Sequence, residues 1–412
     1  MIKKINIKIH TYTFAIFCIF LCFTLSSCSF NHGDNNVITT PANSPENTDG
    51  NEMTVLTEEE AIIAASNYMK DMTVEEKIGQ LFVVNLEQLD TKKGNYFEWK
   101  KCTKRMVKSL EKYHVGGVIL FSRNIAGRKQ TINLINKLQE GSATPLFVTV
   151  DEEGGEVARI GGNKKMKTTA FPTMEEIGNT KDADYVYDMG VTIGSEIKEL
   201  GFNVDFAPVA DVKTSELNLE IGSRSFGDNP DKVAEMVTSF VKGIQSQNVS
   251  AALKHFPGQG SSNGDTHIDS VNIDSSIMWL RKNDFVPFEE GIEAGADFVM
   301  VSHISVSKVT ETSQPASMSE LIMDTILREE LGFHGVIVTD AMDMASITNH
   351  YTSAEAAYGA VKGGADIVLM PVSLDEAYNE ILTKVNDGKI SSERLDESVL
   401  RILTVKFKRG II

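Results

Sequence analysis

The chain has 412 residues and a formal net charge of −17, and 42% of its residues are hydrophobic. So acidic a chain is not expected to bind nucleic acid, because binding to phosphates depends on clustered lysine and arginine side chains. The stretch of residues 55–412 is long enough for one large α/β domain.

The first residues have the pattern of an export signal. Lys3, Lys4 and Lys8 precede an uncharged apolar run from Thr11 to Leu25, and Leu-Ser-Ser-Cys ends at Cys28. A basic region, a short apolar run and small residues predict a signal peptide over 1–27. The run is shorter than the roughly 20 apolar residues that a membrane span needs. The last four residues resemble a bacterial lipoprotein box, which implies a lipid on Cys28; an ordinary cleaved signal is the alternative.

Residues 28–54 are polar and rich in Asn, Pro and Thr, which predicts a disordered tether. Loss of the signal peptide removes three lysines and no acidic residue, so the formal charge changes from −17 to −20. We therefore expect an exported protein that the lipid, and not a basic patch, anchors to the outer face of the cytoplasmic membrane, or to the periplasmic side in a Gram-negative cell. Only Cys28 and Cys102 would remain, so no internal disulfide framework is expected.

From Thr57 onward, short apolar runs alternate with amphipathic stretches. Thr57-x-x-Glu60 and Thr73-x-x-Glu76 are capping-box patterns that predict two leading helices. Further helices are predicted over 128–140, 230–247, 319–331 and 353–362. The runs predicted to be strands are Gln80–Leu86, Val115–Phe121, Leu146–Val150, Asn203–Pro208, Ser250–His255, Asp297–His303, Gly335–Asp340 and Asp366–Met370. Eight buried strands separated by helices predict an α/β fold of the (β/α)8 TIM-barrel type, in a single catalytic domain.

Polar side chains follow five of these strands. A charged residue after one apolar run can simply mark where a strand meets solvent. Five such ends with Asp, Lys and His favour an active site, because barrel enzymes build their sites at the carboxyl ends of the strands. The residues are Asp151, Asp211, Lys254 with His255, His303 and Asp340.

The segment Lys254–Gly260, KHFPGQG, is followed by Asp265 and His267 in a loop rich in glycine. A carboxylate two residues from an imidazole can accept its Nδ1–H and raise its basicity. A lone Asp-x-His is more often an uncoupled surface turn. Its place in the same loop as Lys254 and His255 favours a catalytic pair.

Other polar residues carry weaker signals. Asp340 is suited to be a nucleophile or a metal ligand, whereas Asp343 is expected to cap the following helix. Glu152 and Glu153 are expected to form no more than a solvated acidic turn. Arg224, between glycine and serine residues, could bind a carboxylate or a sugar hydroxyl.

Together these segments resemble glycoside hydrolase family 3, and specifically its β-N-acetylglucosaminidase branch. Two departures from that branch are Gln259, where a histidine is usual, and Val271, where a proline is common. The segments that carry the resemblance are EEKIGQLFVV (75–84), GGVILFSRN (116–124), VDEEGG (150–155), VDFAPVADV (204–212), IGSRSFG (221–227), KHFPGQG (254–260), GDTH (264–267) and TDAMDM (339–344).

The resemblance implies retaining hydrolysis of terminal β-linked N-acetylglucosamine, with cell-wall muropeptide fragments as substrates and no metal or organic cofactor. It implies that Asp340 is the nucleophile and that His267, paired with Asp265, is the general acid/base. The residues it implies for holding the sugar are Asp151, Arg224, Lys254 and His255, with Asp211 and His303 as neighbours.

Three alternatives stay open. The first is a related β-glycosidase or an N-acetylglucosaminide phosphorylase. The second is a non-catalytic sugar-binding lipoprotein. The third is a metallohydrolase, whose ligands would be His255, Asp265, His267 and Asp340.

Overall fold

The computed structural model describes residues 56–94, 96–215 and 217–412. The expected signal peptide, Cys28 and the tether lie outside the described residues and stay predictions. Within the described ranges, no helix is both long enough and apolar enough to cross a membrane.

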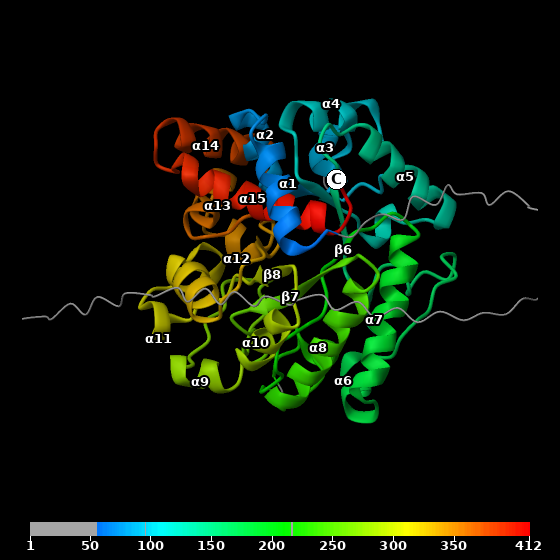
Figure 1. Cartoon of the computed structure of the whole chain (residues 1–412). Coiled ribbons are helices and arrows are strands. Elements are labelled where there is room, and N and C mark those ends of the chain that lie inside the picture. Colours follow the sequence, from blue (N-terminus) through cyan, green and yellow to red (C-terminus); the bar gives the residue numbers. More distant parts are fainter. Residues whose placement is uncertain (1–55, 95, 216) are drawn as a thin grey trace, which may run out of the picture. The chain divides into compact units, whose positions relative to one another are not determined.

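Eight parallel strands form a barrel surrounded by helices (Figure 1). Their order around the barrel is β10-β1-β2-β3-β6-β7-β8-β9, and a parallel bridge between Val338 and Ile367 joins β9 to β10. The predicted (β/α)8 architecture is therefore confirmed. The strands are β1 (Phe82–Val84), β2 (Gly117–Ile119), β3 (Phe147–Val150), β6 (Val204–Asp205), β7 (Ser250–Phe256), β8 (Phe298–Val301), β9 (Val336–Thr339) and β10 (Val368–Leu369).

All eight predicted strands are present, and most are shorter than their apolar runs. The run predicted over 203–208 forms β6 only at Val204–Asp205. One reason is that Pro208 has no N–H for a strand ladder. Strand β7 is one residue longer than predicted and ends at Phe256, so the KHFPGQG segment begins inside the barrel wall.

The helices agree closely with the sequence patterns. Thr57 and Thr73 both form their predicted capping boxes. The helix predicted over 319–331 is a π-helix, η5 (Leu321–Glu330). The α-helices are α1 (Glu58–Met69), α2 (Val74–Gln80), α3 (Leu86–Leu89), α4 (Lys104–Tyr113), α5 (Arg128–Glu140), α6 (Met174–Thr180), α7 (Ala183–Lys198), α8 (Pro230–Gln245), α9 (Ile277–Lys282), α10 (Val286–Glu293), α11 (Ser307–Thr310), α12 (Ala345–Thr348), α13 (Ser353–Lys362), α14 (Leu374–Asn386) and α15 (Ser392–Lys408). Short 3-10 turns are η1 (Thr91–Lys93), η2 (Ser122–Asn124), η3 (Gly222–Arg224) and η4 (Ala316–Met318).

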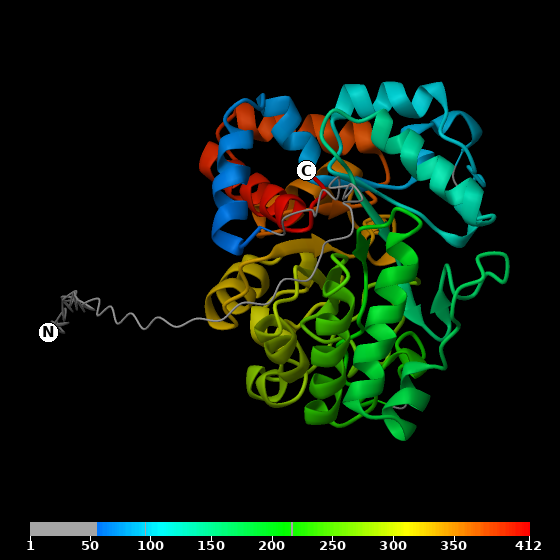
Figure 2. The same ribbon diagram turned by 45° about the vertical axis from the view of Figure 1, so that its right-hand side comes forward.

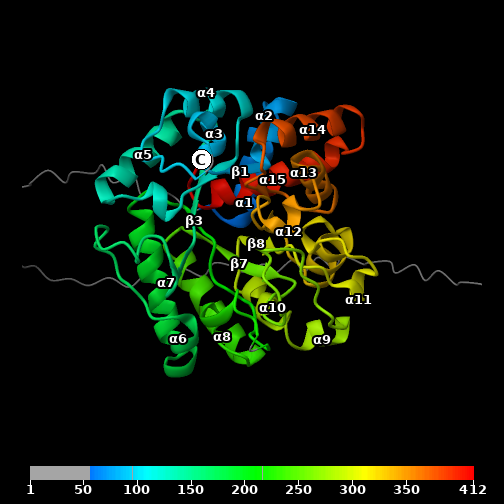
Figure 3. The ribbon, with the colours of Figure 1, turned by 180° about the vertical axis from the view of Figure 1, so that it is seen from behind.

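Helices α1 and α15 lie side by side against the barrel (Figure 3). An ion pair of 2.7 Å between Glu58 and Lys408 joins them. The first described helix is thereby tied to the last one.

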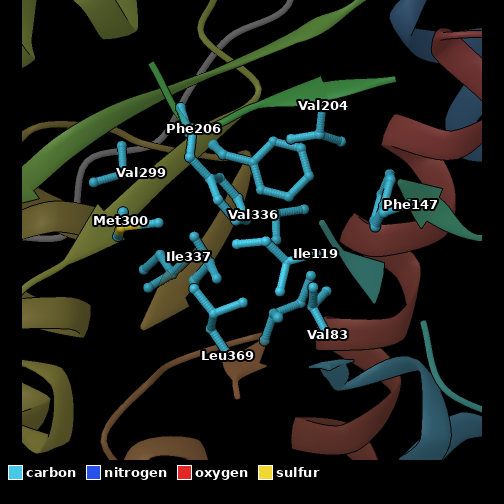
Figure 4. Close-up of a cluster of buried hydrophobic side chains, with 14 of the residues drawn as sticks. Val83, Ile119, Phe147, Val204, Phe206, Val299, Met300, Val336, Ile337 and Leu369 are labelled. Atoms are coloured by element: carbon cyan, nitrogen blue, oxygen red, sulfur yellow. The ribbon is translucent and has the colours of Figure 1, made fainter. Parts of the chain in front are cut away.

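Side chains from facing strands fill the interior of the barrel (Figure 4). Phe147, Phe206 and Ile337 are at most 1% exposed. The rings of Phe147 and Phe298 pack edge to face with their centroids 5.3 Å apart. The interior is thus a packed core and not a pore, and a ligand must bind at one end of the barrel.

The connection after β3 is longer than the others and contains a hairpin, β4 (Glu152–Gly154) and β5 (Val157–Ala158). Figure 2 shows this segment, in teal-green, at the right-hand side of the barrel. The first strand of the hairpin, β4, follows Asp151 directly, so the hairpin lies at the carboxyl end of the barrel.

Candidate active site

A cavity of about 400 Å³ opens at the carboxyl ends of the strands, within the size range of small-molecule sites. Of the residues predicted for the site, six line this cavity: Asp151, Arg224, Lys254, His255, His267 and Asp340. Asp211, Asp265 and His303 are not in its lining. The strand-end pattern in the sequence therefore locates the cavity correctly, while three of its residues act from behind or beside the wall.

Four charged side chains form one cluster on the wall of the cavity. The Lys254 amine lies 3.0 Å from Asp151 Oδ1 and 2.6 Å from Glu153 Oε1. Arg224 donates two hydrogen bonds to the Glu153 carboxylate, at 2.8 and 2.9 Å. The side chains of Lys254 and Glu153 are 2% and 1% exposed.

The charges in this cluster stabilise one another. Burial alone would raise the pKa of Glu153, but Arg224 and Lys254 outweigh burial and hold that pKa well below its ordinary value. Burial alone would lower the pKa of Lys254, but Asp151 and Glu153 raise it. Both groups are therefore ionised at neutral pH, and removal of Glu153 would leave Arg224 without its carboxylate partner.

Asp211 holds His255 from behind the cavity wall. Its Oδ2 lies 2.7 Å from His255 Nδ1 and accepts the His255 amide at 3.1 Å. Its Oδ1 accepts the Gln259 amide at 2.6 Å. The carboxylate can only accept from the ring, so Nδ1 of His255 carries a proton, while its Nε2 lies 3.5 Å from Arg224 Nη2.

Asp340 follows β9 directly and lines the cavity. Burial alone would raise its pKa, but His255, His303 and the Ala341 amide together hold the pKa below its ordinary value. The Ala341 amide donates to Asp340 Oδ1 at 2.7 Å. An ionised carboxylate at this place is suited to nucleophilic attack.

His303 is buried and supports the backbone next to Asp340. Its Nε2 lies 2.9 Å from the Ala341 carbonyl, which can only accept, so Nε2 carries the proton. Its Nδ1 then accepts from the Ser317 hydroxyl at 2.8 Å. Burial lowers the pKa of His303. His303 therefore orients the peptide that follows Asp340 and lies outside the lining of the cavity.

His267 lies on the loop after β7, and 64% of its side chain is exposed. Its Nδ1 is 3.0 Å from Asp265 Oδ1, as the Asp-x-His pattern predicts, and 3.2 Å from Glu220 Oε1. The hydrogen bond to Glu220 is the largest cause that raises the pKa of His267 to about 9. Two carboxylates at Nδ1 keep the proton there, so Nε2 is the atom that can exchange a proton with a substrate.

The glycines of KHFPGQG give this loop its path. Gly258 has φ +112°, and a Cβ at Gly258 would lie 2.5 Å from Asp284 Cβ. The two departures from the family pattern are both buried: Gln259 is 1% exposed and its side chain reaches Thr266 Oγ1 at 3.4 Å. Val271 packs against Gly264. Gln259 thus connects the buried wall to the loop that carries His267.

Two predictions from the sequence are wrong. Glu152 and Glu153 are not a solvated acidic turn, since both are buried. Burial raises the pKa of Glu152 to about 7, and its carboxylate accepts hydrogen bonds from two backbone amides at 2.6 and 2.7 Å.

Asp343 does not cap the next helix, because the cap of α12 is Met344 and has no side-chain hydrogen bond. Asp343 instead lines the cavity, where burial and then the charge of Asp340 raise its pKa to about 6.

Sequence reasoning missed several residues of the wall. Glu220 lies before the IGSRSFG segment in a stretch without periodicity, so no local signal marks it. Arg159 lies in hairpin residues that carry no motif, and its Nη2 is 3.7 Å from Asp151 Oδ2. Tyr96 and Arg123 line the outer part of the cavity.

The geometry does not support the alternative metal set of His255, Asp265, His267 and Asp340. Among the residues that the structure describes, the potential ligand atoms that cluster within 4.8 Å belong to Glu220, Asp265 and His267. These three groups already contact one another, since both carboxylates lie within 3.2 Å of His267 Nδ1.

The chain is similar to known proteins. Residues 73–405 match the family described as Glycosyl hydrolase family 3 N terminal domain. Beta-hexosaminidase A of Pseudoalteromonas piscicida is 35% identical over 327 residues, which are 73% of this chain and 54% of the relative. The beta-hexosaminidase of Stenotrophomonas maltophilia (strain K279a) is 34% identical over 65% of this chain and 80% of its own length.

A solved structure is also similar. The glycoside hydrolase family 3 beta-N-acetylglucosaminidase from Paenibacillus sp. str. FPU-7 superposes with a TM-score of 0.77 and 34% identity, over 82% of this chain and 63% of that chain. This chain thus spans about half of the first relative and less than two thirds of this structure. The family match covers most of the described barrel and all of the cavity's charged residues. The chain therefore belongs to glycosyl hydrolase family 3.

Proposed function

We propose that this protein is a retaining β-N-acetylhexosaminidase that removes terminal β-linked N-acetylglucosamine. One observation carries the proposal: the ionised Asp340 and the imidazole of His267 line the same cavity. A nucleophilic carboxylate and a proton donor facing one site are what double displacement at a sugar carbon requires. Relatives described as beta-hexosaminidases support the choice of sugar.

In the first step, an Asp340 oxygen attacks the anomeric carbon while the bond from that carbon to the leaving oxygen breaks. His267 Nε2 gives its proton to the leaving oxygen, so the product departs as a neutral alcohol. In the second step, water attacks the same carbon and the bond to Asp340 breaks. His267 takes the proton of that water, which regenerates the protonated imidazole.

The buried cluster would hold the sugar. Asp151 offers carboxylate oxygens to sugar hydroxyls, and Lys254 and Arg224 offer N–H groups, while His255 Nε2 is an acceptor at the same wall. Because these groups are fixed by one another, they are ordered before a ligand arrives, which reduces the entropy that binding would cost.

We propose that the natural substrates are cell-wall muropeptide fragments met outside the cytoplasmic membrane. The group that gives its proton to the leaving oxygen is an imidazole and not a carboxylic acid, so this group itself adds no negative charge beside an anionic leaving group such as N-acetylmuramic acid. The predicted lipoprotein signal would export the protein to a compartment where such fragments occur. The same property of the imidazole favours phosphate as an acceptor, and a phosphorylase is therefore the second candidate.

The function is tested by incubating the purified protein with an aryl β-N-acetylglucosaminide and with muropeptides, with and without phosphate. Release of β-N-acetylglucosamine, independent of phosphate, is expected. Accumulation of the sugar 1-phosphate would favour the phosphorylase. Tight binding of the glycosides without turnover would favour a non-catalytic receptor.

The proposed location is tested by the variant Cys28→Ser. This variant should lose the lipid and leave the membrane fraction, with unchanged turnover by the purified barrel, because a diacyl anchor adds about 0.8 kcal/mol per buried CH₂. Recovery of the wild-type protein in the cytoplasm with residues 1–27 intact would contradict the lipoprotein proposal.

A further inference from the structure

Glu220 connects the exposed acid/base loop to the buried wall of the cavity. Its carboxylate accepts the Thr266 amide at 2.9 Å and the Thr266 hydroxyl at 2.5 Å. Its backbone carbonyl accepts Arg224 Nη1 at 3.1 Å. Glu220 is thus fixed from both sides, and its partner Thr266 is the residue directly before His267.

Two carboxylates compete for one imidazole nitrogen, and they differ in exposure. Glu220 is 5% exposed, whereas Asp265 is 42% exposed, and both lie within 3.2 Å of His267 Nδ1. Water and salt screen the charge of an exposed group far more than that of a buried one. The buried carboxylate should therefore act more strongly on the imidazole, although the sequence motif names only the exposed one.

We propose that Glu220 is a positioning residue of the acid/base site, which holds the loop through Thr266 and keeps His267 protonated beyond neutral pH. The meaning for catalysis rests on the proposed function; the effect on His267 titration does not. Glu220 is the largest cause that raises the pKa of His267 to about 9, and Asp265 and Asp340 act in the same direction. Its own pKa is lowered to about 2, because the hydrogen bonds from His267 and Thr266 outweigh its burial.

At a given pH, the Glu220 charge affects the rates of the two steps of catalysis in opposite ways. The first step needs a protonated His267, so its rate should hold up to pH of about 9 and fall above it. The second step needs the neutral imidazole, so its rate should rise toward the same pH. Removing the Glu220 charge lowers the pKa of His267, which shifts both limbs to lower pH.

The titration is tested without any turnover. The imidazole nitrogens of His267 are followed by NMR against pH in the wild type, Glu220→Gln and Asp265→Asn, with a chelator present and with His267→Gly for assignment. Glu220→Gln should lower the His267 pKa by about one unit or more, and Asp265→Asn by less. An unchanged pKa in Glu220→Gln, or a larger fall in Asp265→Asn, would overturn the proposal.

Activity gives an independent reading. In Glu220→Gln, kcat/KM for a substrate with a poor leaving group should begin to fall at a lower pH than in the wild type. The difference should equal the change in the His267 pKa. At pH 6 the loss of kcat/KM should be less than about threefold. A uniform loss at every pH would mean that Glu220 only supports the fold. Glu235→Gln, which removes an exposed carboxylate on α8, is the matched control and should change neither limb.

A second variant covers the case in which Glu220→Gln fails to fold. Glu220→Asp keeps the charge but moves it away from Nδ1, so its His267 pKa should fall between those of the wild type and the neutral variant. A wild-type pKa in Glu220→Asp would overturn the proposal in that case. If the wild type has no glycosidase activity at all, the proposed function fails, while the NMR comparison still decides the role of Glu220.

Discussion

The two sides of the cavity are built in different ways. The side proposed to hold the sugar consists of strand ends and their ion pairs, where the Lys254 and Glu153 side chains are at most 2% exposed. The acid/base side is a loop, where the His267 side chain is 64% exposed. Catalysis needs both a fixed sugar and a group that exchanges protons with leaving oxygen and water.

The difference follows from what each side does. A buried ion-pair network keeps its geometry, because any displaced member leaves an uncompensated charge. A group that exchanges protons with both a large leaving group and water has to be accessible to both. Two hydrogen bonds at Thr266 help to link the two sides: the Gln259 side chain donates to the Thr266 hydroxyl, and the Thr266 amide donates to the Glu220 carboxylate.

The largest effect is expected from removing Asp340, the proposed nucleophile. Asp340→Ala should lower kcat by at least about 10³-fold, since no bond to the anomeric carbon can form in its place. Circular dichroism and ligand binding should stay close to the wild type. Turnover within tenfold of the wild type would remove Asp340 from the mechanism.

His267→Gly tests the exposed side, where the effect should depend on the leaving group. A nitrophenolate leaves without a proton, whereas a sugar leaving group needs one and should lose about 10² to 10⁴ in rate of the first step. The second step should slow for both, and added azide should restore it by attacking the glycosyl-enzyme. Equal losses for both leaving groups in the first step would argue that His267 only binds.

Glu153→Gln tests whether the buried side depends on its charges. The change leaves Lys254 and Arg224 partly unpaired, which costs about 3 kcal/mol or more for a buried pair. Thermal unfolding should begin several degrees lower, and KM should rise by at least about tenfold. Glu156→Gln, an exposed neighbour on the same hairpin, should leave both unchanged; the same fall in both variants would contradict the special role of Glu153.

The sequence predicted the barrel because most of its strands are continuous apolar runs, a signal that depends on local residues alone. It also predicted Asp340, Lys254 and His267, since each lies at a strand end or in a dense local motif. The lengths of β6 and β10 could not be predicted, because pairing with neighbours sets where a ladder stops.

The partners of those site residues were harder to predict. Glu153 was taken for a solvated turn residue, since its burial comes from Arg224, which is 71 residues away along the chain. Glu220 gave no signal, because its contact with His267 exists only after two loops fold against each other. Asp211 was expected near the sugar, yet its amide and imidazole partners place it behind His255.

The smallest effect is expected at the link between the two sides. Gln259→Leu removes the side-chain bond to Thr266, which is long at 3.4 Å, and keeps the backbone bond to Asp211. A neutral hydrogen bond of this kind contributes about 1 kcal/mol or less, so kcat/KM should fall by no more than about fivefold. The loss should be confined to substrates that need protonation, since only the His267 side depends on Thr266. An equal loss with a nitrophenyl substrate would show that Gln259 acts through the buried wall instead, by way of Asp211 and His255.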